Sequence, residues 1–140
     1  MNILYSTQAT AIGGRGGWVG SDDGALKIKL STPEALGGAG GPGSNPEQLF
    51  AAAYSACFLD AVRAAAAELD IEITDDANVT TTIAVGRRDE ASKLGLRVGL
   101  SVDLAGLDPE KAEALIERAD ALCLISNALR GGVSGRIHVS

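Results

Sequence analysis

A long apolar helix is the feature that most constrains what this chain can fold into. Alanine and other apolar residues dominate the stretch from Leu49 to Ala67. A start signal precedes it, because Asn45 is a good N-cap and Pro46 suits the first helical position. We expect the helix to run to about Leu69. Its small and apolar residues lie all round the predicted cylinder, which is typical of a helix buried on most sides.

Charged residues argue against a membrane role for this helix. Asp60 and Arg63 lie near its middle, where charges in a bilayer are costly. Residues 1–5 lack the charged region and apolar run of a signal peptide. The chain carries 12 Lys plus Arg against 18 Asp plus Glu, a net charge of −6, which disfavours binding to nucleic acid or an anionic membrane. We therefore expect a soluble, cytoplasmic protein with neither partner.

The order of the predicted elements indicates an α+β fold. Strands precede and follow the long helix, and a second helix begins at Asp108 and Pro109 by the same capping logic. No repeat or long linker divides the 140 residues, so we expect a single domain over 1–140. The predicted elements besides the helices are strands over 2–12, 18–30, 71–87, 94–104 and 136–140, and a helical turn over 33–36 within a Gly-rich loop.

The two cysteines lie on the two predicted helices. Cys57 is about three turns into the first helix, and Cys123 is at the end of the second. In a reducing compartment such a pair is either inert core or redox-active, and each cysteine taken alone favours the core interpretation. The sequence spacing leaves open whether their Cα atoms fall within disulfide range. Two Cys and the single His138 cannot supply a standard zinc site, so we expect no metal.

Three other features have a structural and a functional interpretation. Arg15 lies between glycine pairs in Gly13–Gly17, which either present one cation in a tight loop or leave it solvated. Glu47 could simply complement the positive end of the helix dipole. The stretch Gly38–Gly43 matches a dinucleotide-binding pattern in form only. It does not directly follow a predicted strand, and no acidic residue ends a second strand, so we expect no dinucleotide cofactor.

The start of the long helix has a distinctive sequence, Ser44-Asn45-Pro46-Glu47-Gln48-Leu49-Phe50-Ala51-Ala52-Ala53-Tyr54-Ser55-Ala56-Cys57-Phe58. This segment closely resembles the organic hydroperoxide resistance family of the OsmC-like superfamily. The likeness continues at Gly13-Gly14-Arg15, Leu36-Gly37-Gly38, Gly106-Leu107-Asp108, and Cys123 with Ser126-Asn127-Ala128. It spans nearly the whole chain, and the block from Asn45 to Phe58 is highly specific.

The resemblance implies a thiol-dependent peroxidase without a cofactor. Cys57 matches the cysteine that reduces an alkyl or fatty-acid hydroperoxide, and Cys123 matches the one that resolves its sulfenic acid as a disulfide. Arg15 and Glu47 match the ion pair that surrounds the reactive thiol. The reductant implied is a dithiol, the dihydrolipoyl group of a protein partner. The fold implied is an intertwined homodimer, with a long central helix against curved antiparallel sheets and active sites at the subunit interface.

The apolar side chains around Cys57 suggest the substrate preference. Phe50, Tyr54 and Phe58 are interpreted as the substrate pocket, although Tyr54 and Phe58 taken alone are more often core residues. We expect hydrophobic peroxides to be preferred over hydrogen peroxide.

The chain departs from the family pattern around Cys123. The family usually has Cys-Pro-Tyr-Ser, whereas Leu124 and Ile125 follow the cysteine here, and Asp120 replaces a common His. These changes bear on how Cys123 is presented and on the choice of peroxide and reductant. Two alternatives therefore remain: a peroxidase of the OsmC branch with different preferences, and a non-catalytic dimeric ligand-binding module whose cysteines are core residues.

Overall fold

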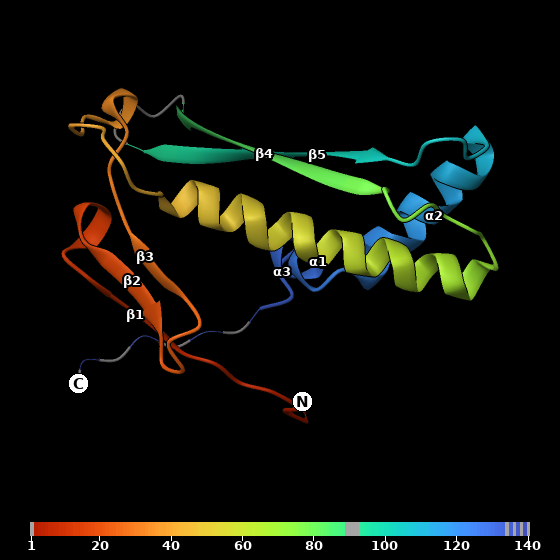
Figure 1. Ribbon diagram of the computed structural model, residues 1–140, viewed down its shortest axis with the longest axis horizontal. Helices are drawn as coiled ribbons and strands as arrows, with labels where there is room; N and C mark the ends of the chain where they lie inside the picture. The colour runs from red at the N-terminus through yellow and green to blue at the C-terminus, as the bar shows by residue number, and fades with distance from the viewer. Residues whose placement is uncertain (1, 89–92, 134, 136, 138, 140) are drawn as a thin grey trace. The chain divides into compact units, whose positions relative to one another are not determined.

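The computed structural model describes residues 2–88, 93–133, 135, 137 and 139. The chain forms two compact units, Met1–Phe50 and Ala51–Ser140. Helix α1, Pro46–Leu69, begins in the first unit and continues through the second (Figure 1). Helices and antiparallel strands are both present, which confirms the predicted α+β class.

The first unit is built on a three-stranded antiparallel sheet. Its strands are β1 (Ala9–Ile12), β2 (Trp18–Ser21) and β3 (Lys27–Lys29), in that order across the sheet. The strands predicted over 2–12 and 18–30 are both longer than the observed ones. The first observed strand begins at Ala9, and a turn divides the second predicted strand into β2 and β3. Asp23 stabilises that turn by accepting hydrogen bonds from the Ser21 hydroxyl and the Ala25 amide. The helical turn predicted over 33–36 is confirmed as a 3-10 helix, η2, over Glu34–Leu36.

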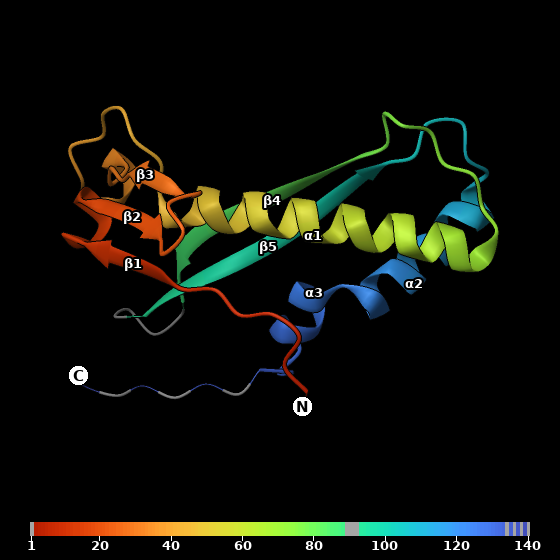
Figure 2. The same cartoon turned by 60° about the horizontal axis from the view of Figure 1, so that its bottom comes forward.

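A long antiparallel hairpin forms the sheet of the second unit. Strand β4 (Asn78–Arg87) pairs with β5 (Leu94–Asp103) along ten residues each. Inward residues alternate with exposed ones along β4, as the period of a half-buried strand requires. The predicted strand over 71–87 is too long, because residues 71–77 do not belong to it. Helix α1 runs alongside this hairpin in Figure 1 and in Figure 2, and the Ser55 hydroxyl donates to Thr81 Oγ1 at 2.9 Å.

Two helices complete the second unit. The Asp108 carboxylate accepts hydrogen bonds from the first amides of α2, Pro109–Leu122, so the predicted N-cap is confirmed. A short helix α3, Leu124–Leu129, follows after one residue and was not predicted. The strand expected over 136–140 rests on Arg136, His138 and Ser140, which lie outside the described residues.

Small residues allow α1 and α2 to approach closely in the core. Ala61, Val62, Ala65 and Ala66 of α1 are buried in one cluster with Leu115 and Ala119 of α2. The expectation of burial on most sides does not hold for the single chain, because one face of α1 is exposed. The exposed residues of that face include Ala52, Ala53, Ala56, Ala64 and Ala67. By length and composition alone α1 could also cross a membrane, but core helices pass the same test.

Candidate active site

An ion pair joins the tip of the β1–β2 hairpin to the start of α1. Gly13 and Gly14 have positive φ of 76° and 59°, a conformation that glycine adopts without strain, and they turn the chain into the 3-10 helix η1, Gly14–Gly16. Arg15 lies in this turn and contacts Glu47 through both arms of its guanidinium. Nη1 donates to Oε2 at 2.9 Å and Nη2 to Oε1 at 2.5 Å. The structure therefore brings together two of the four residues expected in the site.

Local capping fixes the position of Glu47. The Gln48 amide donates to Asn45 Oδ1 at 2.9 Å, and the Asn45 amide donates back to Gln48 Oε1 at 3.2 Å. This reciprocal capping box holds Glu47 in the first turn, where the helix dipole favours a negative charge. The Arg15 hydrogen bonds lower the pKa of Glu47, and Glu47 raises the pKa of Arg15. Both groups are therefore charged at neutral pH.

The two cysteines meet inside the second unit. Cys57 on α1 is partly buried, and Cys123 between α2 and α3 is 1% exposed. Their Sγ atoms are 3.6 Å apart, and both residues are free thiols. A disulfide requires a separation of about 2.05 Å, so the sulfurs need to approach by only about 1.5 Å to bond. The two sulfurs therefore lie near each other, which the sequence spacing alone could not show.

Burial opposes ionisation of the Cys57 thiol. Desolvation is the largest influence and raises the pKa of Cys57, and the neighbouring Cys123 raises it further. The backbone amides of Ile125 and Leu124 act in the opposite direction. In these surroundings the thiol dominates over the thiolate at neutral pH, so a reactive Cys57 requires further stabilisation of its negative charge.

An apolar cavity lies between α1, β5 and α2. It has a volume of about 640 Å³ and is lined by Tyr54, Phe58, Leu100, Ala112, Glu113, Ile116, Glu117 and Asp120. The rings of Tyr54 and Phe58 meet edge to face, with centroids 6.2 Å apart. Cys57 lies between these two residues in the helix and packs against the same core. Phe50, the third residue expected in the pocket, is partly buried one turn earlier on α1.

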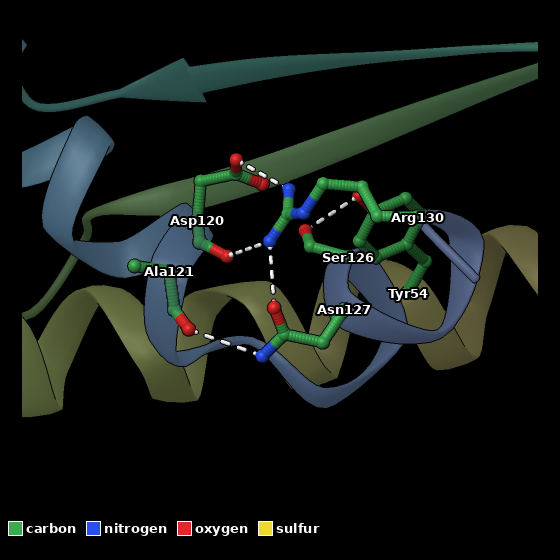
Figure 3. A network of polar contacts seen from close by, with 6 residues as sticks. All are labelled: Tyr54, Asp120, Ala121, Ser126, Asn127 and Arg130. Atoms are coloured by element: carbon green, nitrogen blue, oxygen red, sulfur yellow. Dashed lines mark hydrogen bonds and ion pairs between the residues drawn. The ribbon is translucent and has the colours of Figure 1, made fainter. Parts of the chain in front are cut away.

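Sequence reasoning missed the polar contacts around Cys123. The hydroxyls of Tyr54 and Ser126 share a buried hydrogen bond of 2.7 Å, and Arg130 bonds to Asp120 and Asn127 (Figure 3). Tyr54 and Ser126 are 72 positions apart, so no local pattern could reveal their contact. Asp120 and Arg130 are ten positions apart, and this spacing predicts an ion pair only if a turn between two helices is already expected between them.

Metal ligation finds no support in the part of the chain that the structure describes. No group of three or more His, Cys, Asp or Glu residues is arranged there to hold an ion.

The comparisons with known proteins extend over nearly the whole chain. The sequence model of the family described as "OsmC-like protein" matches residues 37–138. The organic hydroperoxide resistance protein of Xanthomonas axonopodis pv. citri (strain 306) is 42% identical over 131 residues, covering 94% of this chain and 91% of that protein.

Solved structures show the same likeness. The crystal structure of the organic hydroperoxide resistance protein OhrB of Bacillus subtilis superposes with a TM-score of 0.82 at 40% identity, covering 94% of this chain and 95% of that one. The structure of an organic hydroperoxide resistance protein from Elizabethkingia anophelis gives a TM-score of 0.84 at 41% identity, covering 94% and 92% of the two chains. The fold of the chain is therefore that of these proteins.

Proposed function

Because the chain belongs to the organic hydroperoxide resistance family within the OsmC-like superfamily, we propose that it is a cysteine-based peroxidase that reduces organic hydroperoxides to alcohols. The observation that carries this proposal is the 3.6 Å approach of the Cys57 and Cys123 sulfurs. Tyr54 and Phe58, which flank Cys57 on the same helix, line an apolar cavity. The bidentate Arg15–Glu47 pair supplies the second part of the machinery.

Cys57 carries out the oxidation step. Its thiolate attacks the terminal oxygen of the hydroperoxide, an S–O bond forms and the O–O bond breaks. The sulfur loses two electrons and becomes a sulfenic acid, while the alkoxide leaves and takes up a proton as the alcohol. The apolar lining from Tyr54 and Phe58 favours a hydrophobic peroxide over hydrogen peroxide.

Cys123 carries out the resolving step. Its sulfur attacks the sulfenic sulfur of Cys57, an S–S bond forms and the hydroxyl departs as water. A dithiol reductant then exchanges with this disulfide, returning both thiols and becoming oxidised itself. A dihydrolipoyl group on a protein partner would supply such a dithiol, and these reactions would take place in the cytoplasm.

Arg15 has two tasks in this mechanism. An unperturbed cysteine is about 3% ionised at pH 7, so full ionisation raises the reactive fraction by at most roughly thirtyfold, about 2 kcal/mol. Burial of Cys57 makes the ionised fraction smaller still. The guanidinium would first stabilise the thiolate and then the charge on the departing oxygen in the transition state. The two-armed contact with Glu47 holds its plane in a way that lysine could not reproduce.

The functional unit in this proposal is a homodimer. The family resemblance implies active sites at the subunit interface, and in this proposal Cys57 of one copy is served there by the Arg15–Glu47 pair of the other. The exposed alanines on one face of α1, such as Ala53 and Ala56, would allow the close approach that a shared core needs.

Stopped-flow oxidation of the reduced protein tests the proposal. We expect an alkyl or fatty-acid hydroperoxide to react much faster than hydrogen peroxide and intact mass to show an intramolecular disulfide. Cys57→Ser should not react, whereas Cys123→Ser should complete the first oxidation and then over-oxidise at Cys57. If both thiols instead resist peroxide and alkylation at neutral pH, the cysteines are inert core residues and the chain is a binding module.

A further inference from the structure

The junction that carries Cys123 consists of a single extended residue. Helix α2 ends at Leu122 and α3 begins at Leu124, while Cys123 between them has φ −66° and ψ 123°. Each helix is internally hydrogen-bonded, so this residue is where the chain changes direction. The position of the Cys123 sulfur therefore depends on how the last turn of α2 is held against α3.

Arg130 joins the two sides of this junction. Its Nη1 donates to Asp120 Oδ2 at 2.7 Å, and its Nη2 donates to the Asp120 carbonyl at 2.9 Å (Figure 3). The same Nη2 donates to Asn127 Oδ1 at 2.7 Å, and Asn127 Nδ2 donates to the Ala121 carbonyl at 3.0 Å. Asp120 and Ala121 belong to α2, whereas Asn127 belongs to α3 and Arg130 caps its end. We call these four residues the junction clamp.

The geometry of the Arg130 guanidinium suits it to hold α2 and α3 in a fixed orientation. Three contacts arise from two arms of one rigid plane, so the clamp fixes an orientation as well as a distance. Arg130 and Asp120 have half-exposed side chains, 50% and 46%, where a single ion pair adds little to overall stability. The clamp therefore has more effect on local geometry than on the free energy of unfolding.

We propose that Arg130 is a positioning residue for disulfide formation, which holds Cys123 within reach of the Cys57 sulfenic acid. This inference rests on the proposed function. The Cys123 sulfur forms the S–S bond, the S–O bond of Cys57 breaks, and the hydroxyl leaves as water with the proton of the Cys123 thiol. The step competes with a second peroxide, which would convert the sulfenic acid to sulfinic acid. A loosened junction would slow disulfide formation, because Cys123 would less often lie in position to bond with Cys57. The slower step would favour over-oxidation to the sulfinic acid.

Arg130→Gln tests the inference, with Arg118→Gln as the matched control. Arg118 is also on the surface of the second unit, 45% exposed, and pairs with Glu68 on α1 at 2.6 Å outside the junction. Single-turnover stopped flow resolves oxidation of Cys57 from disulfide formation, and mass spectrometry measures the sulfinic acid. In Arg130→Gln we expect unchanged oxidation, disulfide formation slower by about tenfold, and more sulfinic acid, because small misplacements of reacting groups cost up to about a hundredfold. Arg118→Gln should match the unsubstituted protein in both phases.

A second variant keeps the inference testable if Arg130→Gln does not fold. Asn127→Ala removes two of the four hydrogen bonds of the junction clamp and leaves the Arg130–Asp120 ion pair in place, so we expect the same selective slowing of disulfide formation to a smaller extent. The inference is overturned if either folded variant forms the disulfide at the rate of the unsubstituted protein. It is also overturned if oxidation of Cys57 and disulfide formation slow equally, or if Arg118→Gln slows disulfide formation as much as Arg130→Gln does. If the unsubstituted protein forms no Cys57–Cys123 disulfide with peroxide, the proposed function fails instead, so the two failures are distinguishable.

Discussion

Opposing influences on one sulfur govern the chemistry at the residue scale. Burial and the nearby Cys123 raise the pKa of Cys57, while the amides of Ile125 and Leu124 lower it. The same burial shields the thiol and surrounds it with apolar side chains that suit a hydrophobic substrate. An enzyme with this arrangement needs a cation that acts on Cys57 during the reaction, and Arg15 is the residue that we propose for it.

Substitution of Arg15 should slow peroxide reduction without unfolding the protein. We expect Arg15→Ala to lower the second-order rate on the order of a hundredfold, the usual effect of removing one donor that stabilises transition-state charge. Arg15→Lys should recover only part of this loss, because an ammonium cannot contact both oxygens of Glu47. Stopped flow measures the rate, and thermal unfolding checks stability. Arg63→Ala, at an exposed arginine that contacts the Asp75 carbonyl, is the control; a normal rate in Arg15→Ala would remove Arg15 from the mechanism.

The pH dependence of Cys57 alkylation should reveal the same cation. In a Cys123→Ser background, where Cys57 is the remaining thiol, iodoacetamide reacts only with the thiolate. A positive charge stabilises the thiolate and lowers the pKa, so removing it with Arg15→Ala should move the midpoint of the rate profile to higher pH. Below the midpoint the rate should fall about tenfold per pH unit. Identical midpoints with and without Arg15 would show that the guanidinium does not act on Cys57.

At the scale of elements, local signals were predictable and distant contacts were not. The caps Asn45 and Asp108 were identified from sequence because each acts within three residues of itself. Helix α3 was missed because six residues are too few to show a helical period. The family pattern pointed to Cys57 and Cys123, but their 3.6 Å approach depends on packing between α1 and the α2–α3 junction, which no local pattern encodes.

The Tyr54–Ser126 hydrogen bond should contribute to the attachment of α3 to α1. Tyr54→Phe leaves the buried Ser126 hydroxyl without this partner, so the free energy of unfolding should fall by about 1–3 kcal/mol. Ser126→Ala should also destabilise the protein, and the double variant should lose less than the sum of the two, because each single variant already breaks the hydrogen bond that the two residues share. Urea unfolding measures all three, with Tyr5→Phe at a 79% exposed tyrosine as the control. Strict additivity would contradict a coupled pair.

At the scale of the whole molecule, a single copy exposes apolar surface that a second copy could cover. Ile12 on β1 and Trp18 on β2 are 75% and 52% exposed, and α1 presents its alanine face. Large exposed apolar patches on soluble proteins commonly mark interfaces. The family resemblance was the only source for a homodimer in the sequence, because composition and periodicity do not specify which surfaces of a chain meet another copy.

Subunit complementation should show whether the active site is shared between two copies. One variant, Cys57→Ser, keeps Arg15 and Glu47 but lacks the nucleophile, while the other, Arg15→Ala, keeps Cys57 but lacks the guanidinium. Each homodimer should be almost inactive. The mixed dimer can be isolated with two different affinity tags. If the site is shared, Cys57 of the Arg15→Ala chain meets the intact ion pair of the Cys57→Ser chain, so one of the two sites is complete. The rate should then reach about half that of the unsubstituted dimer, because the guanidinium stabilises the transition state at that one site. If each site is built within one copy, the mixed dimer has no complete site and reacts no faster than the Arg15→Ala homodimer. A mixed dimer of Cys57→Ser with the unsubstituted chain is the control, because it contains one intact site under either arrangement.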